Sequence, residues 1–220
     1  MIARGLVTAL LIAPALGGCA HVIDGTPAWP GARLEKVLLA SADFPPGVLY
    51  DRIVERPGEP DGAGGPPAML STPEGCSDGF TRVIAATAER GPGSAAKYTV
   101  TYDGARMLVT VLSWQLDLDS LEATAQRCAH YDTFFDRSSP AIPMTTTRLD
   151  ATRPAALVFE QTMQLGAQRS SVYYSFENVD GMAVFAVGFP TPDPTVTVRG
   201  TLPQTFLDVT GKQANRIGGG

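Results

Sequence analysis

The sequence predicts an α+β domain in which five or six antiparallel strands are flanked by three helices. Three observations support this class. The chain has 220 residues, 44% of them hydrophobic, which is enough for one core-bearing domain and disfavours two. Apolar residues alternate along several segments, as they do in strands, and recur at helical spacing in others. Turn-forming residues, above all Asp103-Gly104, separate the alternating segments.

The domain is expected to begin with a short helix and an edge strand. Apolar residues at helical spacing predict a short amphipathic helix over residues 32–41. Residues 48–54 follow as an edge strand. The glycine- and proline-rich segment 57–67 has few side chains to bury, so it is predicted to be a mobile loop.

A second helix and a β-hairpin follow. Ser77 is a favourable N-cap, and a helix is predicted from it to about Arg90. Residues 96–102 and 105–115 are rich in β-branched and apolar residues and flank Asp103-Gly104, which predicts a hairpin. The second strand of this hairpin is apolar on both faces, which indicates a central strand covered on both sides.

The second half of the domain is predicted as a helix, a meander and a final helix. Asp119, with a glutamate three residues later, resembles a capping box and predicts a helix to about Phe135, with Cys128 on its inward face. Pro203 suits the first turn of a last helix, which ends before the three terminal glycines. The four strands of the antiparallel meander are expected at residues 145–149, 156–164, 169–177 and 182–189.

The N-terminus resembles a bacterial lipoprotein signal. One basic residue precedes an apolar run of about 12 residues, which is too short to cross a bilayer core that requires about 20. The run ends in Leu16-Gly17-Gly18-Cys19, which is similar to a lipobox. This resemblance implies that residues 1–18 are removed, that Cys19 carries the lipid, and that residues 19–31 tether a single domain (32–217) to the outer face of the cell membrane. The alternative is an ordinary secretory signal that leaves Cys19 as a thiol.

Cysteine counting predicts one disulfide. If Cys19 carries lipid, only Cys76 and Cys128 remain, and outside the cytoplasm such a pair is expected to be oxidised. The alternative is two separate buried thiols.

Composition excludes some classes of function. Seventeen basic and 22 acidic residues give a net charge of -5, and no run of Lys and Arg exceeds two, so nucleic acid is not an expected partner. Two histidines and three cysteines provide few ligands for a metal, and we expect neither a metal nor a cofactor.

One string resembles a catalytic motif. Residues 75–79, Gly-Cys-Ser-Asp-Gly, match G-x-S-x-G, but a nucleophile elbow needs a buried strand before the serine and a histidine after the acid. The preceding segment does not have the pattern of a core strand, and His130, the only downstream histidine, is predicted on a solvent-exposed helix face with Tyr131 and Asp132. Ser77 is therefore interpreted as a helix cap, with a serine hydrolase as the alternative.

In the order of its predicted helices, strands and cysteines, the chain resembles actinobacterial cell-envelope lipoproteins of unknown function. These lipoproteins are related to the extracellular sensor domain of mycobacterial PknH-type serine/threonine kinases. The residues that carry the resemblance are Leu34-x-x-Val37-Leu38 before Asp43-Phe44-Pro45-Pro46-Gly47, then Pro73-x-x-Cys76, a strand ending near Trp114, and Cys128. The resemblance implies a twisted antiparallel β-sheet with flanking helices, one helix-to-helix disulfide and an open cleft. The chain departs from the kinase domains in having no cysteine after Cys128 for their second disulfide.

These observations predict a lipid-anchored, non-enzymatic binding or sensor-like module of the cell envelope, with a small amphiphile or an envelope protein as partner. Because three helices cover one face of such a sheet, a ligand groove is expected on the Val184-Ala186-Gly188 side, beneath the 57–67 loop. Tyr173, expected beside this groove, could instead simply pack over the small residues. A purely structural envelope protein with a protein partner is a further alternative.

Overall fold

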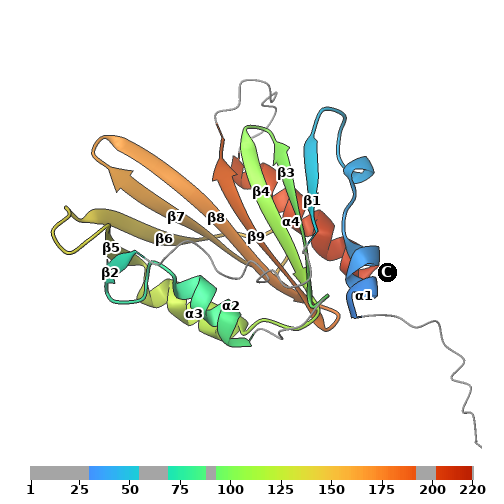
Figure 1. The fold of residues 1–220 in the computed structure, drawn as a ribbon, viewed down its shortest axis with the longest axis horizontal. Helices are drawn as coiled ribbons and strands as arrows, with labels where there is room; N and C mark the ends of the chain where they lie inside the picture. The colour runs from blue at the N-terminus through green and yellow to red at the C-terminus, as the bar shows by residue number, and fades with distance from the viewer. Residues whose placement is uncertain (1–29, 55–68, 88–92, 192–201, 220) are drawn as a thin grey trace, which may run out of the picture.

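The protein is described by a computed structural model, which places residues 30–54, 69–87, 93–191 and 202–219. Within these residues the chain forms one antiparallel sheet of nine strands in the order β1-β3-β4-β9-β8-β7-β6-β5-β2 (Figure 1). The strands are β1 (Leu49–Ile53), β2 (Leu70–Thr72), β3 (Ala95–Tyr102), β4 (Ala105–Leu112), β5 (His130–Phe134), β6 (Ile142–Leu149), β7 (Leu157–Leu165), β8 (Gln168–Val179) and β9 (Met182–Pro190).

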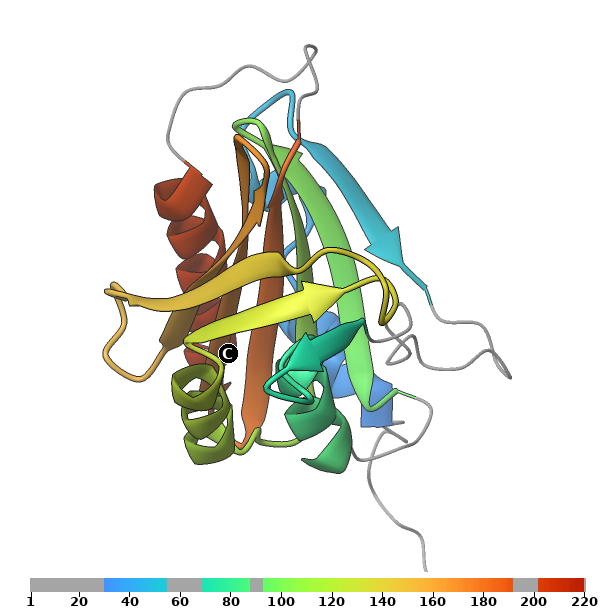
Figure 2. The same cartoon turned by 90° about the vertical axis from the view of Figure 1, so that its left-hand side faces the viewer.

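The helices of the described chain are divided between the two faces of the sheet. In Figure 1, α4 lies behind the strands, whereas α2 and α3 pack together in front of them. Figure 2 shows that α2 and α3 lie near one end of the strongly twisted sheet. The four α-helices are α1 (Pro30–Val37), α2 (Gly79–Thr87), α3 (Leu118–Arg127) and α4 (Leu202–Gly218), and a single 3-10 turn spans Ser41–Asp43.

Alternating residues of β9 explain this division. Val184 and Ala186 belong to an apolar cluster with residues of α1 and α4. Ala183 and Phe185 point to the other face, where they pack with Phe80 of α2 and residues of α3. Successive side chains of a strand point to opposite faces, so a strand that is apolar throughout requires helices on both sides.

Helix α4 lies unusually close to the sheet at Gly188 of β9. A Cβ atom at this glycine would lie 2.8 Å from Cδ2 of Phe206, a fully buried residue of α4. The missing side chain therefore provides the space that the phenyl ring occupies. This contact fixes α4 across the centre of the sheet, over β8 and β9.

A buried glutamine joins α4 to α1. Gln213 is 0% exposed, and its Nε2 donates to the carbonyl of Val37 at 2.8 Å, while the amide of Leu39 donates to its Oε1 at 3.1 Å. These backbone groups belong to the end of α1, where carbonyls and nearby amides have no partner within the helix. One side chain therefore satisfies two backbone groups and holds α1 against α4.

The strand count of five or six and the helix count of three were wrong, because the described residues alone form nine strands and four α-helices. Segment 32–41 forms a helix as its pattern indicates, over Pro30–Val37, and brings the helices to four. The strands that the prediction missed are β2 and β5. The helix predicted to reach Phe135 ends at Arg127 instead.

The β5 error has a local physical cause. Tyr131 and Thr133 are buried while their neighbours are more exposed, which is the two-residue period of a strand. Aromatic and β-branched residues favour this conformation, and β6 and β2 supply the pairing that stabilises it. His130 lies exposed on this strand and not on a helix face.

The cap of α3 lies two residues before the predicted one, and α2 begins later than predicted. The carboxylate of Asp117, not that of Asp119, accepts the amide of Ser120 at 2.9 Å and caps α3. Hydrogen bonds from Ser120 lower the pKa of Asp117. Helix α2 begins at Gly79, two residues after Ser77.

Several predicted elements were confirmed. Strand β1 lies at an edge of the sheet, and β3 and β4 form the expected hairpin, with positive φ at both Asp103 and Gly104. Strands β6 to β9 form the expected meander, and α4 forms the final helix. The predicted signal, Cys19 and the 57–67 loop lie outside the described residues.

The buried glutamine provides a test of how α1 is held. Gln213→Leu leaves a buried amide and a buried carbonyl without their partner, so we expect the free energy of unfolding to fall by about 2 kcal/mol or more. Gln204 is exposed on the same helix, and Gln204→Leu is the matched control, expected to change stability by less than about 0.5 kcal/mol. Urea unfolding curves for both variants measure the difference, and equal effects would show that the Gln213 contacts contribute nothing.

Candidate functional site

The predicted groove on the Val184-Ala186-Gly188 side is filled by the chain itself. Val184 is 2% exposed and Ala186 is 0% exposed beneath α4. The ring of Phe206 occupies the space over Gly188, with its centroid 6.2 Å from that of the buried Tyr173. The prediction failed because it assumed that all the helices cover the other face of the sheet, whereas α4 covers the Val184-Ala186-Gly188 face. Phe206, rather than Tyr173 alone, packs over the small residues.

Two exposed apolar side chains of the sheet lie on its opposite face. Phe189 of β9 is 42% exposed and Ile53 of β1 is 37% exposed. With Leu108 of β4 they line a shallow cavity of about 370 Å³. Among the described residues nothing covers these side chains completely.

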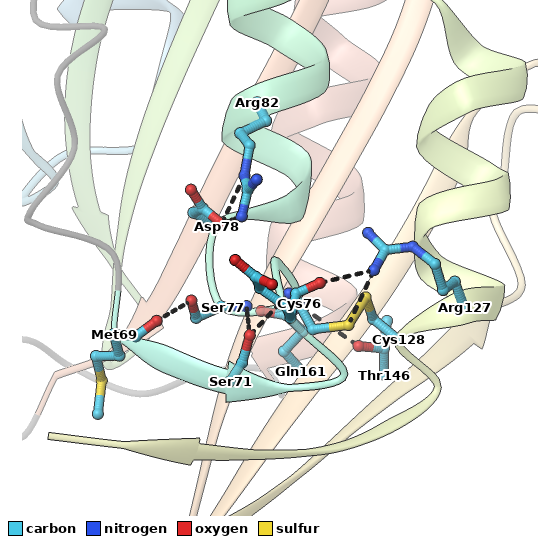
Figure 3. The surroundings of a disulfide bond; sticks show 11 residues. Met69, Ser71, Cys76, Ser77, Asp78, Arg82, Arg127, Cys128, Thr146 and Gln161 are labelled. Carbon is cyan, nitrogen blue, oxygen red and sulfur yellow. Dashed lines mark hydrogen bonds and ion pairs between the residues drawn. A yellow bond between two sulfur atoms is a disulfide. The ribbon is translucent and has the colours of Figure 1, made fainter. Parts of the chain in front are cut away.

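The predicted disulfide joins Cys76, which precedes α2, to Cys128, the C-cap of α3 (Figure 3). The two Cα atoms are 5.5 Å apart, and both cysteines are 2% exposed against Tyr131. Burial raises the pKa of Tyr131 to about 12, so its hydroxyl remains protonated at neutral pH. Cys128 was predicted midway along a longer helix, but it lies just after the helix ends.

Ser77 takes part in the hydrogen bonds around the disulfide (Figure 3). The Ser77 hydroxyl donates to the backbone carbonyl of Met69. Oγ of Ser71 accepts the amides of Cys76 and Ser77 at 3.0 and 3.4 Å. A serine nucleophile needs a base that takes its proton, and here the proton is directed to a carbonyl.

The glycine that ends the G-x-S-x-G string also has a packing role. A Cβ atom at Gly79 would lie 2.6 Å from Cγ2 of Thr124, so this glycine permits α2 to approach α3 closely. Arg127, at the end of α3, donates to the carbonyl of Glu74 at 3.2 Å. The string therefore forms the junction between α2, α3 and β2.

A second region, which the sequence analysis did not identify, lies between α1, the end of α4 and the β8–β9 turn. It is a cavity of about 770 Å³, which we call the basic cavity. Cavities of this size accept small ligands or polar headgroups. Its lining consists of four cations (Arg33, Lys36, Lys212 and Arg216), the polar residues Asp180 and Asn215, the apolar residues Val37, Leu39, Met182 and Ile217, and Gly219.

Contacts within the chain fix three of the four cations. Arg33 donates to the carbonyl of Asp180 at 3.1 Å. Arg216 pairs with the carboxylate of Asp43, and Lys212 donates to the Asp43 carbonyl. Lys36 is exposed and makes no hydrogen bond or ion pair with the described residues.

The basic cavity has an excess of positive charge in an acidic chain. Its four cations face two carboxylates, those of Asp180 and Asp43, which leaves two positive charges in a chain of net charge -5. Lys36 and Arg216 lie in last helical turns, where cations offset the helix dipole. Arg33 lies one turn from the start of α1, where the dipole does not favour a cation, so helix stability does not explain it.

A signal for this cavity was present in the sequence. Arg33 and Lys36 are three residues apart, and Lys212 and Arg216 are four apart, so each pair lies on one face of its helix. What the sequence does not show is that α1 and α4 bring the two faces together. The buried Gln213 contributes to that contact through its hydrogen bonds to Val37 and Leu39.

No helix in the described residues is long and apolar enough to span a bilayer. No group of three or more histidine, cysteine, aspartate or glutamate side chains in the described part of the chain is arranged to hold a metal.

Comparison with known proteins gives one structural likeness. The X-ray structure of an uncharacterised Mycobacterium smegmatis protein, the Rv0999 ortholog, matches with a TM-score of 0.44 and 12% sequence identity, covering 86% of this chain and 95% of that chain. No protein family and no curated protein matches the chain.

Removing the Cys76–Cys128 disulfide is expected to lower the stability of the protein measurably. It closes a loop with a sequence separation of 52, so Cys128→Ser is expected to lower the free energy of unfolding by about 2–4 kcal/mol. Thiol titration of the denatured, unreduced mature protein is the direct check on the pairing. We expect no free thiol, and two free thiols would show that Cys76 and Cys128 are not joined.

A structural role for Ser77 and a catalytic role predict different effects of Ser77→Ala on stability and on probe labelling. Ser77→Ala loses the hydrogen bond to Met69 and should lower the free energy of unfolding by about 1 kcal/mol, while Ser170→Ala, at an exposed position, should change it little. A fluorophosphonate probe is expected to label neither wild type nor variant. Labelling of the wild type that disappears in Ser77→Ala would instead establish the hydrolase alternative.

Proposed function

We propose that this protein is a lipid-anchored, non-enzymatic binding module of the bacterial cell envelope, and that the basic cavity is its binding site for an anionic ligand. The observation that carries the proposal is the position of the cavity. Arg33 and Lys36 lie on α1, the first helix of the described chain, which follows the proposed anchor at Cys19 by a short tether.

The disulfide supports an exported location. Disulfides such as Cys76–Cys128 persist in oxidising compartments and are rare in the reducing cytoplasm. The third cysteine, Cys19, follows a signal-like segment that resembles a lipobox. Lipidation accounts for the cysteine that the disulfide leaves over, and it places the domain on the outer face of the cell membrane.

A binding role is favoured over hydrolysis by the surroundings of Ser77. Its hydroxyl donates to Met69, and its neighbour Cys76 is held in the disulfide. The basic cavity, by contrast, combines exposed cations with a buried apolar floor and polar groups at its edge. Such a combination binds and orients a ligand without requiring a nucleophile or a base. The resemblance to envelope lipoproteins and to kinase sensor domains supports the same reading.

Metabolic labelling with a palmitate analogue tests the anchor. The wild-type protein, expressed in a bacterium that processes lipoproteins, is expected to take up the label, and Cys19→Ser is expected to lose it completely. Cys128→Ser makes the same chemical change within the domain, and it should keep the label. Unchanged labelling of Cys19→Ser would contradict the anchor, whatever the cavity binds.

A further inference from the structure

We propose that the basic cavity binds the phosphate of anionic lipid headgroups, so that the domain lies with its α1–α4 side against the membrane that carries it. This inference rests on the proposed function, which places the chain at a membrane and a ligand in this cavity. It adds the chemical class of the ligand, a phosphate monoester or diester, and the orientation of the domain.

The arrangement of the cations fits a phosphate group. Arg33 and Lys36 project from α1, and Lys212 and Arg216 from α4, on two sides of one cavity. Guanidinium groups match the geometry of phosphate oxygens with paired N–H donors, and lysine adds a mobile point charge. Lys36 has no partner in the described chain, so it gains a charge-assisted contact when a phosphate enters.

Two carboxylates near the cavity are already engaged, whereas Asp180 lines the cavity and offsets one of its four cations. Asp43 pairs with Arg216, and Glu35, which also lies on α1, pairs with Arg52. Asp117 and Asp119, at the start of α3, belong to the opposite face of the sheet and do not line the cavity. An approaching anion therefore meets an excess of positive charge at the basic cavity.

The apolar floor explains why the ligand is a headgroup rather than an acyl chain. Leu39 is 1% exposed, Met182 is 2% exposed and Ile217 is 3% exposed, so these side chains are committed to the core. These three side chains therefore contribute little to the accessible surface of the cavity. The accessible edge of the cavity is cationic and polar, which favours binding at the level of the lipid phosphates.

The tether brings this side of the domain to the membrane. Eleven positions separate Cys19 from Pro30, and a fully extended chain of that length spans at most about 40 Å. Arg33 lies on the first turns of α1, directly after the tether. Salt limits attraction between exposed charges to about 8 Å at physiological ionic strength, so the anchor supplies proximity and the cations determine orientation.

The test measures membrane binding without the lipid anchor, so that its result is independent of Cys19. Every described helix and strand begins at or after Pro30, and the chain from Ala20 onwards retains them all. This protein is titrated with phosphatidylcholine vesicles that contain or lack phosphatidylglycerol. We expect binding only to the anionic vesicles, weakening as salt is raised.

Charge-reversal variants localise the binding. Arg33→Glu combined with Lys36→Glu is expected to weaken vesicle binding about tenfold or more. Arg106→Glu combined with Arg169→Glu makes the same change in net charge at exposed positions outside the cavity, and it should weaken binding far less. Lys36→Glu alone alters an exposed side chain without a partner in the described chain, so it preserves the fold and should give an intermediate loss.

Three outcomes would overturn the proposal. Equal binding to both vesicle types would show that lipid charge is not recognised, and equal losses in the two double variants would show that the cavity is not the site. Calorimetric titration with glycerol phosphate tests whether the cavity binds a soluble phosphate compound instead of a lipid headgroup. Binding of this soluble ligand, without binding to anionic vesicles, would assign the cavity to a free phosphate compound and not to a membrane.

Discussion

The contact between Phe206 of α4 and Gly188 of β9 determines how the rest of the molecule is arranged. The sheet is apolar on both faces, so a helix layer on each side is needed to remove it from water. Phe206 fits where a side chain on Gly188 would lie, and this fit places α4 across the middle of one face. From there Gln213 holds the end of α1, and the two helices enclose the basic cavity. The same helix that closes the expected groove thus forms one wall of the basic cavity.

The other face is covered by a helix pair that depends on the disulfide. Helices α2 and α3 have 9 and 10 residues, too short to be stable alone. Phe80 packs against the rings of Phe159, Tyr174 and Phe176, with centroids 5.2 to 5.4 Å away, and this cluster attaches α2 to the sheet. The Cys76–Cys128 bond then joins the start of one helix to the end of the other. Ser77 lies in this junction, and its hydrogen bonds join the segment before α2 to Met69 and Ser71.

The sequence was informative where local rules decide the structure. Asp103-Gly104 identified the β3–β4 hairpin because few residues tolerate two successive positive φ values. The disulfide followed from counting cysteines, and the meander from alternation and turns. Local rules failed where contacts between segments distant in the sequence determine the structure. Strand β5 begins soon after α3 ends, so the sequence pattern predicts one continuous helix. Asp117 and Asp119 are both residues that favour the N-cap position. The basic cavity joins helices from opposite ends of the chain, and no local pattern reveals that contact.

Hydrogen exchange of the lipidated protein on a membrane tests the central claim, that the α1–α4 side faces anionic lipid. The protein would be reconstituted through its anchor into phosphatidylcholine bilayers with and without phosphatidylglycerol, and amide exchange compared between them. We predict that the anionic lipid slows exchange in α1 and in the last turns of α4, where the cations of the cavity lie, and leaves α2 and α3 unchanged. Protection confined to α2 and α3, or no difference between the two bilayers, would contradict the account.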